Sequence, residues 1–267
     1  MLILLTQRAL GDRQNDIIRW LSAPDPSLNY NNALKARNVK TGTWLIESAV
    51  FLRWTLNAGS LLWLYGIPGC GKTILSSTII QYLLDHCHQR PRSAVLYFYF
   101  DFNESGKQRH ENMIRSLITQ LSVCQKSISD SLDSLYNSGR QPTNKGLLDT
   151  LHSMITASNE VFIILDALDE CTERPELLSD IEEIMKWQDI RLHVLVTSRR
   201  EVDIEESLEP LCDEETSICI QSALVDADIR TYVHDRLSED RSFKRWRNQP
   251  KVQQEIETEL MEKAKGM

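Results

Sequence analysis

Short apolar runs alternate with longer amphipathic segments between residues 61 and 220. Nearly every position in four of these runs is apolar, which is typical of strands buried on both faces of a parallel sheet. The four runs lie at residues 61–65, 94–100, 161–165 and 192–196, and a weaker fifth lies at residues 217–220. Helical patterns follow the first three runs, near residues 72–86, 111–123 and 176–187. The pattern therefore predicts an α/β three-layer sandwich around a mainly parallel five-stranded sheet with right-handed crossovers.

Helical patterns without intervening strands occupy both ends of the chain. Three of them come first, at residues 10–22, 31–37 and 44–56, and two come last, at residues 226–237 and 251–265. We therefore expect three units along the chain: an N-terminal helical lead-in over residues 1–57, an α/β domain over residues 58–225 and a partial C-terminal helical subdomain over residues 226–267.

The composition is that of an ordinary globular protein, with 42% hydrophobic and 25% charged residues. A net charge of −8 argues against broad binding of nucleic acid or of an anionic membrane, both of which favour a basic surface. No run approaches the roughly 18 apolar residues of a membrane span. The six cysteines contain no C-x-x-C pair, which fits a reducing compartment. We therefore expect a cytoplasmic protein with neither a nucleic-acid nor a membrane partner.

The strongest functional signal directly follows the first apolar run. Residues 66–73 fit the Walker A pattern G-x-x-x-x-G-K-[ST]. Its glycines let the backbone wrap around a phosphate chain with several N–H groups pointing inward, and the following helix adds the positive end of its dipole. Lys72 would reach the β- and γ-phosphates, while the Thr73 hydroxyl would coordinate Mg²⁺. The predicted nucleotide-binding residues of this segment are Gly66, Ile67, Pro68, Gly69, Cys70, Gly71, Lys72 and Thr73.

A second, Walker B-like signal ends the third apolar run, where Asp166 is followed by Asp169 and Glu170. A carboxylate at the end of a buried strand is costly unless a partner satisfies it. In a P-loop protein that partner is Mg²⁺, held jointly with the P-loop hydroxyl. We therefore predict a metal site made by Asp166 and Thr73. Asp169 and Glu170 lie just past the strand tip, where they either orient an attacking water or form a solvated acidic loop.

A third signal is the sequence Thr-Ser-Arg-Arg at residues 197–200, which closes the fourth apolar run. Ligands of open α/β sheets lie outside the carboxyl ends of the strands, so these side chains face the same crevice as the phosphate loop. Arg199 is placed either to contact the γ-phosphate or to lie on the surface as an ordinary arginine.

With these three signals in order, the sequence resembles the NACHT-type nucleotide-binding domains of the signal-transducing P-loop NTPases, known as STAND proteins. It is most similar to the nephrocystin-like NACHT modules of filamentous fungi. The resemblance spans roughly residues 10–267 and is carried by residues 62–73, 165–171 and 197–201, with weaker support from residues 20–22 and 42–48.

The resemblance implies a P-loop NTPase fold and a nucleotide-dependent signalling switch. It would make Arg199 a sensor beside the P-loop strand, and the family pattern D-[GAS]-x-D-E would make Asp169 and Glu170 the water-orienting, catalytic acids. Members of the family exchange a nucleoside diphosphate for ATP or GTP, open and self-associate, and in fungi they occur in NLR-like incompatibility or defence proteins. Residues 226–267 would begin the helical lid subdomain, and the family's winged-helix region would follow it.

Two other functions stay open beside a switch with slow Mg²⁺-dependent hydrolysis. One is a scaffold that binds nucleotide without turnover. The other is a P-loop phosphotransferase, which would need an arginine-rich substrate lid; the serine-rich stretch at residues 124–150 contains few arginines and weighs against it.

Overall fold

The computed structural model describes residues 2–38, 41–125, 127–187, 191–213, 215–220, 223–239 and 249–264. Lys265, the last residue of the final predicted helix, lies outside the described residues. The helices, in chain order, are α1 (Leu2–Leu21), α2 (Ser27–Ala36), α3 (Thr43–Ile46), α4 (Ala49–Leu56), α5 (Lys72–Cys87), α6 (His110–Gln125), α7 (Asp130–Asn137), α8 (Asn144–Thr156), α9 (Arg174–Met185), α10 (Val202–Leu208), α11 (Ala223–Glu239) and α12 (Pro250–Ala264). No helix in these ranges is both long and apolar enough to cross a bilayer.

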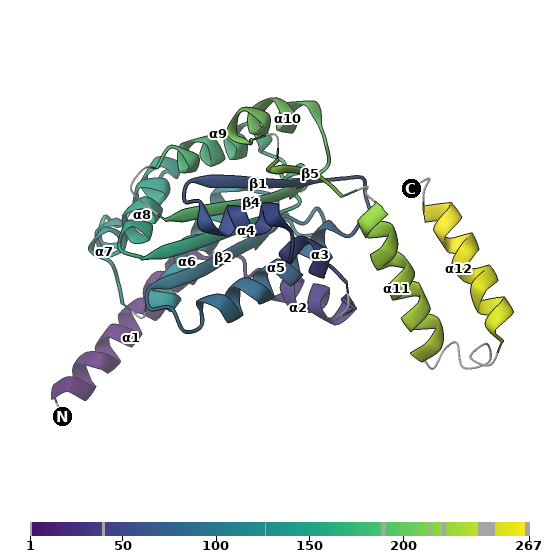
Figure 1. Ribbon diagram of the computed structural model, residues 1–267. Helices are drawn as coiled ribbons and strands as arrows, with labels where there is room; N and C mark the ends of the chain where they lie inside the picture. Colours follow the sequence, from purple (N-terminus) through teal and green to yellow (C-terminus); the bar gives the residue numbers. More distant parts are fainter. Residues whose placement is uncertain are drawn as a thin grey trace.

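A five-stranded sheet forms the centre of the molecule (Figure 1). Its strands are β1 (Ser60–Tyr65), β2 (Ser93–Tyr99), β3 (Glu160–Asp166), β4 (Leu192–Ser198) and β5 (Ser217–Cys219). Their order is β2-β3-β4-β1-β5, and every neighbouring pair is parallel. The prediction of a parallel five-stranded α/β fold is confirmed, and β4 lies beside the strand that leads into the Walker A segment.

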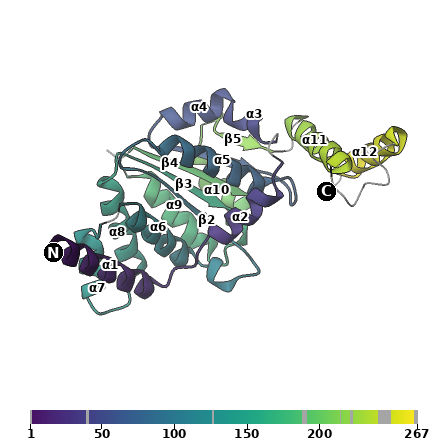
Figure 2. The same cartoon turned by 90° about the horizontal axis from the view of Figure 1, so that it is seen from below.

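Side chains of the central strands alternate between two hydrophobic cores. On one face, Leu61 and Trp63 of β1 belong to a core shared with α1 and with α6 to α10. On the other face, Leu62 and Leu64 pack with α4 and α5, and Tyr30 of α2 joins them. Figure 2 shows these helices on either side of the sheet, which makes the three layers. Because all five strands point the same way, the residues at their carboxyl ends meet along one edge.

Several helices begin or end at other residues than the sequence predicts, and in three cases a serine or threonine hydroxyl caps the N-terminus of the helix. The predicted helix over residues 44–56 is divided into α3 and α4, because Ser48 takes an extended backbone and its Oγ accepts the Phe51 N–H at 3.1 Å. The stretch at residues 124–150 contains α7 and the start of α8, which are capped in the same way by Ser129 and Thr143. α1 begins at Leu2, well before the predicted residue 10.

At the β2 edge of the sheet, the side chain of Gln120 hydrogen-bonds to the backbone near the middle of the strand. β2 is an edge strand, so its outward backbone groups have no strand to pair with. The Gln120 side chain of α6 accepts the Tyr97 N–H at 3.0 Å and donates to the Tyr97 carbonyl at 2.8 Å. One amide group therefore reproduces the contacts that a neighbouring strand would make at this position.

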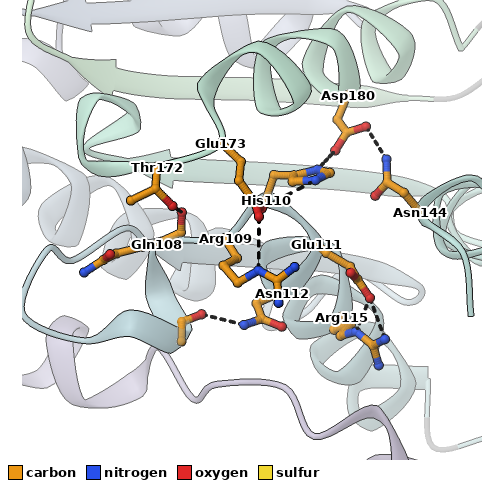
Figure 3. A network of polar contacts seen from close by, with 11 residues as sticks. Gln108, Arg109, His110, Glu111, Asn112, Arg115, Asn144, Thr172, Glu173 and Asp180 are labelled. Atoms are coloured by element: carbon orange, nitrogen blue, oxygen red, sulfur yellow. Dashed lines mark hydrogen bonds and ion pairs between the residues drawn. The ribbon is translucent and has the colours of Figure 1, made fainter. Parts of the chain in front are cut away.

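A polar network joins α6, α8 and α9 (Figure 3). His110 Nδ1 lies 2.6 Å from Asp180 Oδ2, and the Asn144 amide donates to Asp180 Oδ1 at 2.7 Å. On its other side, His110 Nε2 lies 3.6 Å from Glu173 Oε2. The hydrogen bond with Asp180 raises the pKa of His110 above its ordinary value and outweighs burial, which lowers it. His110 and Asp180 therefore join α6 to α9, and the Asn144 contact adds α8 to them.

We predict that replacing His110 by Gln lowers stability in a pH-dependent way. Since the folded pKa lies above the ordinary 6.5, the imidazolium contributes fully below about pH 6.5 and its contribution is lost as the pH rises through the folded value. The free energy of unfolding of wild type should exceed that of the variant by about 1.5–3 kcal/mol near pH 5.5, as for other charge-assisted hydrogen bonds. Urea unfolding at a series of pH values measures this difference, with exposed His88→Gln as control. A constant difference up to pH 9 would contradict the prediction.

Candidate functional site

The Walker A segment forms the turn between β1 and α5. Gly69 and Gly71 have φ angles of +79° and +92°, in the left-handed region that favours glycine. A Cβ on Gly66 would lie only 2.7 Å from Cys70 Sγ, so the loop closes tightly on itself. Gly71 immediately precedes the first turn of α5, where backbone N–H groups have no partner within the helix. The loop is therefore a tight, glycine-dependent turn that leads directly into the N-terminus of α5.

Lys72 lies folded over this loop. Its Nζ donates to the carbonyl oxygens of Gly66 at 2.7 Å and of Ile67 at 2.9 Å. An ammonium group thus lies at the loop and is held by neutral acceptors only, since no ion pair of Lys72 occurs within the described residues.

Asp166, at the end of β3, is 2% exposed and is surrounded by hydroxyl groups. Its Oδ2 accepts from Thr73 Oγ1 at 2.8 Å, and its Oδ1 accepts from Ser76 Oγ at 2.6 Å and Thr197 Oγ1 at 2.8 Å. Burial raises the pKa of Asp166, while these three donors and the positive charge of Lys72 lower it. No lysine, arginine or histidine of the described ranges forms an ion pair with this carboxyl group. The structure therefore brings Asp166 and Thr73 together, while no side-chain cation of the described residues lies within ion-pair distance of the buried acid.

Asp169 and Arg199 lie against each other at the tips of β3 and β4. Arg199 Nε is 3.0 Å from Asp169 Oδ2, and the Arg199 backbone N–H donates to Asp169 Oδ1 at 2.9 Å. The Asp169 side chain is only 4% exposed, whereas that of Arg199 is 48% exposed. Asp169 is thus a buried acid with a specific partner rather than part of a solvated loop, and the arginine retains an open side.

Glu170 turns away from this pair toward the loop that follows β2. Its Oε2 accepts the backbone N–H of Phe102 at 2.9 Å. Burial is the main cause that raises the pKa of Glu170, and the neighbouring carboxylates of Asp169, Asp101 and Asp166 add to it, while the Phe102 N–H lowers it. The two acids that follow β3 therefore lie in different surroundings.

A pocket of about 330 Å³ adjoins the phosphate loop. Its walls come from the lead-in around Trp44, from the loop at Gly69 to Gly71 and from Tyr232 of α11. Asp228 of α11 closes one side, where its Oδ2 accepts the Gly42 N–H at 2.6 Å and the Trp44 indole N–H at 3.1 Å. Burial raises the pKa of Asp228. The pocket is thus shared by the lead-in, the loop and the first C-terminal helix.

Sequence reasoning missed three parts of this site. Ser76 lies one helical turn after Thr73, so the spacing of three residues on α5 was a usable signal. Thr197 belonged to the recognised third signal, but its contact with Asp166 depends on how β3 and β4 pair. The Phe102 N–H belongs to the backbone and leaves no mark in the sequence.

A comparison with protein families decides the relationship. The family described as nephrocystin 3, N-terminal matches residues 40–199, which include the phosphate loop, the acids after β3 and Arg199. The chain belongs to this family. The resemblance to nephrocystin-like NACHT domains is thereby confirmed, and the chain is a NACHT-like nucleotide-binding module.

The individual relatives of this nephrocystin-type domain share at most a quarter of their aligned residues with it in the examples below. The vegetative incompatibility protein HET-E-1 of Podospora anserina is 25% identical over 213 residues, which cover 73% of this chain but only 15% of that protein. Among solved structures, a chain of the Drosophila ORC bound to DNA has a TM-score of 0.48 and 17% identity, over 80% of this chain and 52% of its own length. C. elegans PCH-2 has a TM-score of 0.39 and 17% identity, over 85% and 47% of the two chains.

We predict that Asp166→Asn makes the ligand-free nephrocystin-type domain more stable while it weakens Mg²⁺-dependent binding. The amide carries no charge, so the burial that raises the pKa of Asp166 no longer opposes folding. Wild type should gain about 2.7 kcal/mol of stability from Mg²⁺ and triphosphate at a hundred times the dissociation constant, and the variant much less.

Urea unfolding with and without Mg²⁺ and triphosphate measures both effects. Asp149→Asn, which changes an exposed carboxylate on α8, is the matched control. A variant that is less stable without ligand and equally stabilised with it would show that Asp166 is a structural residue only.

Proposed function

We propose that this domain binds a nucleoside triphosphate, ATP or GTP, together with Mg²⁺ and acts as a signalling switch that hydrolyses the nucleotide slowly. The observation that supports it most is the buried Asp166 carboxyl group, which accepts a hydrogen bond from the Thr73 hydroxyl in the first turn of α5 and forms no ion pair within the described residues. Membership of the nephrocystin family agrees with this assignment.

The residues at the loop suit both groups. Carboxylate and hydroxyl oxygens are the ligands that Mg²⁺ prefers, and Thr73 and Asp166 supply one of each. When bound, the ion would neutralise negative charge on the phosphate oxygens. Lys72 would leave the carbonyls of Gly66 and Ile67 for the β- and γ-phosphates, because a charged acceptor gives a stronger hydrogen bond than a neutral carbonyl.

We place the purine base in the pocket beside the loop. The pocket joins directly onto Gly69 to Gly71, and Trp44 and Tyr232 offer aromatic surface in its wall. α11 helps to form this wall and is tied to the lead-in through Asp228, so the occupant of the pocket would contact the C-terminal helices. This is a direct route from bound nucleotide to the position of α11 and α12.

Two contacts support slow hydrolysis. Arg199 neutralises Asp169, and the Phe102 N–H engages Glu170, so both acids have partners before a nucleotide is bound. We assign the orientation of the attacking water to Glu170, and to Asp169 the task of holding Arg199 toward the γ-phosphate. The exposed side of Arg199 would face that phosphate. Whether the ion pair between Arg199 and Asp169 is formed would then depend on which nucleotide is bound.

The signalling role extends this proposal to the longer protein. HET-E-1 is by its name a vegetative incompatibility protein, and we propose that the present domain serves an NLR-like defence or incompatibility protein as its nucleotide-controlled, self-associating part. Its lead-in would be residues 1–57, its nucleotide-binding domain residues 58–225 and its lid subdomain residues 226–267. The cytoplasmic location stays a prediction.

Lys72→Ala tests nucleotide binding. The variant loses charge-assisted contacts worth about 1.5–3 kcal/mol each, so triphosphate affinity should fall about ten-fold or more. Calorimetric titration measures it, with circular dichroism to establish that the fold persists and Lys145→Ala, an exposed lysine on α8, as control. Unchanged affinity in a folded variant would refute the assignment of the phosphate loop.

Replacing the two acids separately tests the division of roles. Glu170→Gln should keep triphosphate binding while hydrolysis falls by about 10²–10⁴-fold, as expected when a general base is lost. Asp169→Asn and Arg199→Ala should each reduce the preference for triphosphate over diphosphate. The double variant should lose no more of this preference than either single variant, because paired residues act together. Phosphate release and titrations with di- and triphosphate measure these effects.

The outcomes separate the candidate functions. A Glu170→Gln variant that hydrolyses at the wild-type rate would contradict the role of Glu170. Phosphate release by the wild-type domain at the background rate would favour the scaffold that binds nucleotide without turnover. In a switch, the Glu170→Gln variant should remain in its triphosphate form and self-associate more in size-exclusion chromatography.

A further inference from the structure

The turn after β2 is held on both sides of Phe102, the residue whose N–H contacts Glu170. On one side, Asp101 Oδ1 accepts the Asn103 N–H at 2.9 Å, which closes a tight turn around Phe102. On the other, the Gln108 side-chain amide donates to the Phe102 carbonyl at 2.6 Å. These contacts constrain the backbone on both sides of Phe102 and therefore the direction in which its N–H points.

The backbone of Gln108 contacts the chain on the far side of Glu170. Its carbonyl oxygen accepts both the Thr172 N–H at 2.9 Å and the Thr172 hydroxyl at 3.1 Å (Figure 3). Thr172 follows Glu170 by two residues. Gln108 therefore contacts the donor to Glu170 with its side chain and the segment that carries Glu170 with its backbone.

Gln108 lies in the chain between Lys107 and His110, whose side chains both contact other parts of the fold. The Lys107 side chain is 2% exposed, and its Nζ lies 2.6 Å from Asn29 Oδ1 and 2.7 Å from Glu104 Oε2. His110, at the start of α6, lies between Asp180 and Glu173. Because both neighbours are fastened to other elements, Gln108 has little freedom to follow Phe102 or Thr172 if either moves.

We infer that Gln108 is a positioning residue for Glu170: it holds the Phe102 N–H and the Thr172 segment at the distances that aim the Glu170 carboxylate at the attacking water. This inference rests on the proposed function, since it assigns no task to Gln108 apart from Glu170. No motif in the sequence includes Gln108.

The contact has a chemical consequence beyond geometry. The Phe102 N–H stabilises the ionised form of Glu170 against burial and against the carboxylates of Asp101, Asp166 and Asp169, which all raise its pKa. A base must be ionised to accept a proton from water. If the N–H turns away, the pKa of Glu170 rises and less carboxylate is present at a given pH.

Gln108→Ala removes the side-chain contact and leaves the backbone contacts with Thr172 in place. We expect kcat for triphosphate hydrolysis to fall about ten- to a hundred-fold, as for other small misplacements of a catalytic group, while nucleotide affinity stays unchanged. The acidic limb of the pH profile of kcat should move to higher pH. A carbon-13 NMR titration of the Glu170 carboxyl, assigned by its loss in Glu170→Gln, should show the same upward shift of its pKa without any need for turnover.

Asn112→Ala is the matched control, because the Asn112 amide (Figure 3) donates to the Gly106 carbonyl of the same loop at 2.8 Å, and no hydrogen bond joins Asn112 to Phe102 within the described residues. It should leave the pH profile and the carboxyl titration as in wild type. In the Glu170→Gln background, Gln108→Ala should cause no further loss of kcat.

The results distinguish this inference from the proposed function. If Glu170→Gln abolishes hydrolysis but Gln108→Ala leaves both kcat and the Glu170 titration unchanged, Gln108 does not position Glu170. The same conclusion follows if Asn112→Ala shifts the titration equally. If Glu170→Gln leaves hydrolysis unchanged, the proposed role of Glu170 fails, whereas the carboxyl titration still decides whether Gln108 governs that side chain.

Discussion

A single carboxylate, that of Asp166, joins the fold to the site. It is buried at the end of a central strand, where an isolated charge is strongly disfavoured. Three hydroxyl groups from α5 and β4 make its burial tolerable, and they can meet only if β3 lies beside β4 and α5 packs across the sheet. The parallel sheet and its two cores are therefore the condition for the site, because they bring donors from distant parts of the chain within hydrogen-bond distance.

The charged groups around Asp166 are satisfied unequally. Within the described residues Lys72 donates to neutral acceptors and Asp166 accepts from hydroxyl groups, whereas Asp169 forms an ion pair with Arg199. Lys72 and Asp166 thus form no ion pair with each other within the described residues, so that each could take a ligand of opposite charge: a phosphate at Lys72 and a metal ion at Asp166. Groups that are incompletely paired in the ligand-free domain lower its stability, and a ligand that pairs with them would raise it, as is common at functional sites.

The sheet was readable from the sequence, whereas the connections within the site were not. Runs such as residues 161–165 are apolar on both faces, and that pattern has few alternatives to a buried parallel strand. The phosphate loop was readable because its glycines and lysine work within one short segment. The contacts of Phe102 and Gln108 depend on which loop lies next to the acids, and the break between α3 and α4 depends on one serine hydroxyl. Such details arise from tertiary packing, which no local pattern records.

The Gln120 side chain on β2 limits how the domain can assemble. An uncovered edge strand invites a strand from another chain, and the sheet has two edges. At Tyr97 the Gln120 amide already takes the backbone donor and acceptor that such a strand would need. At the opposite edge, β5 is only three residues long and offers a short ladder. Copies of this domain would accordingly join through helices and loops, whose contacts can be made and released as those elements shift, rather than through a continuous sheet.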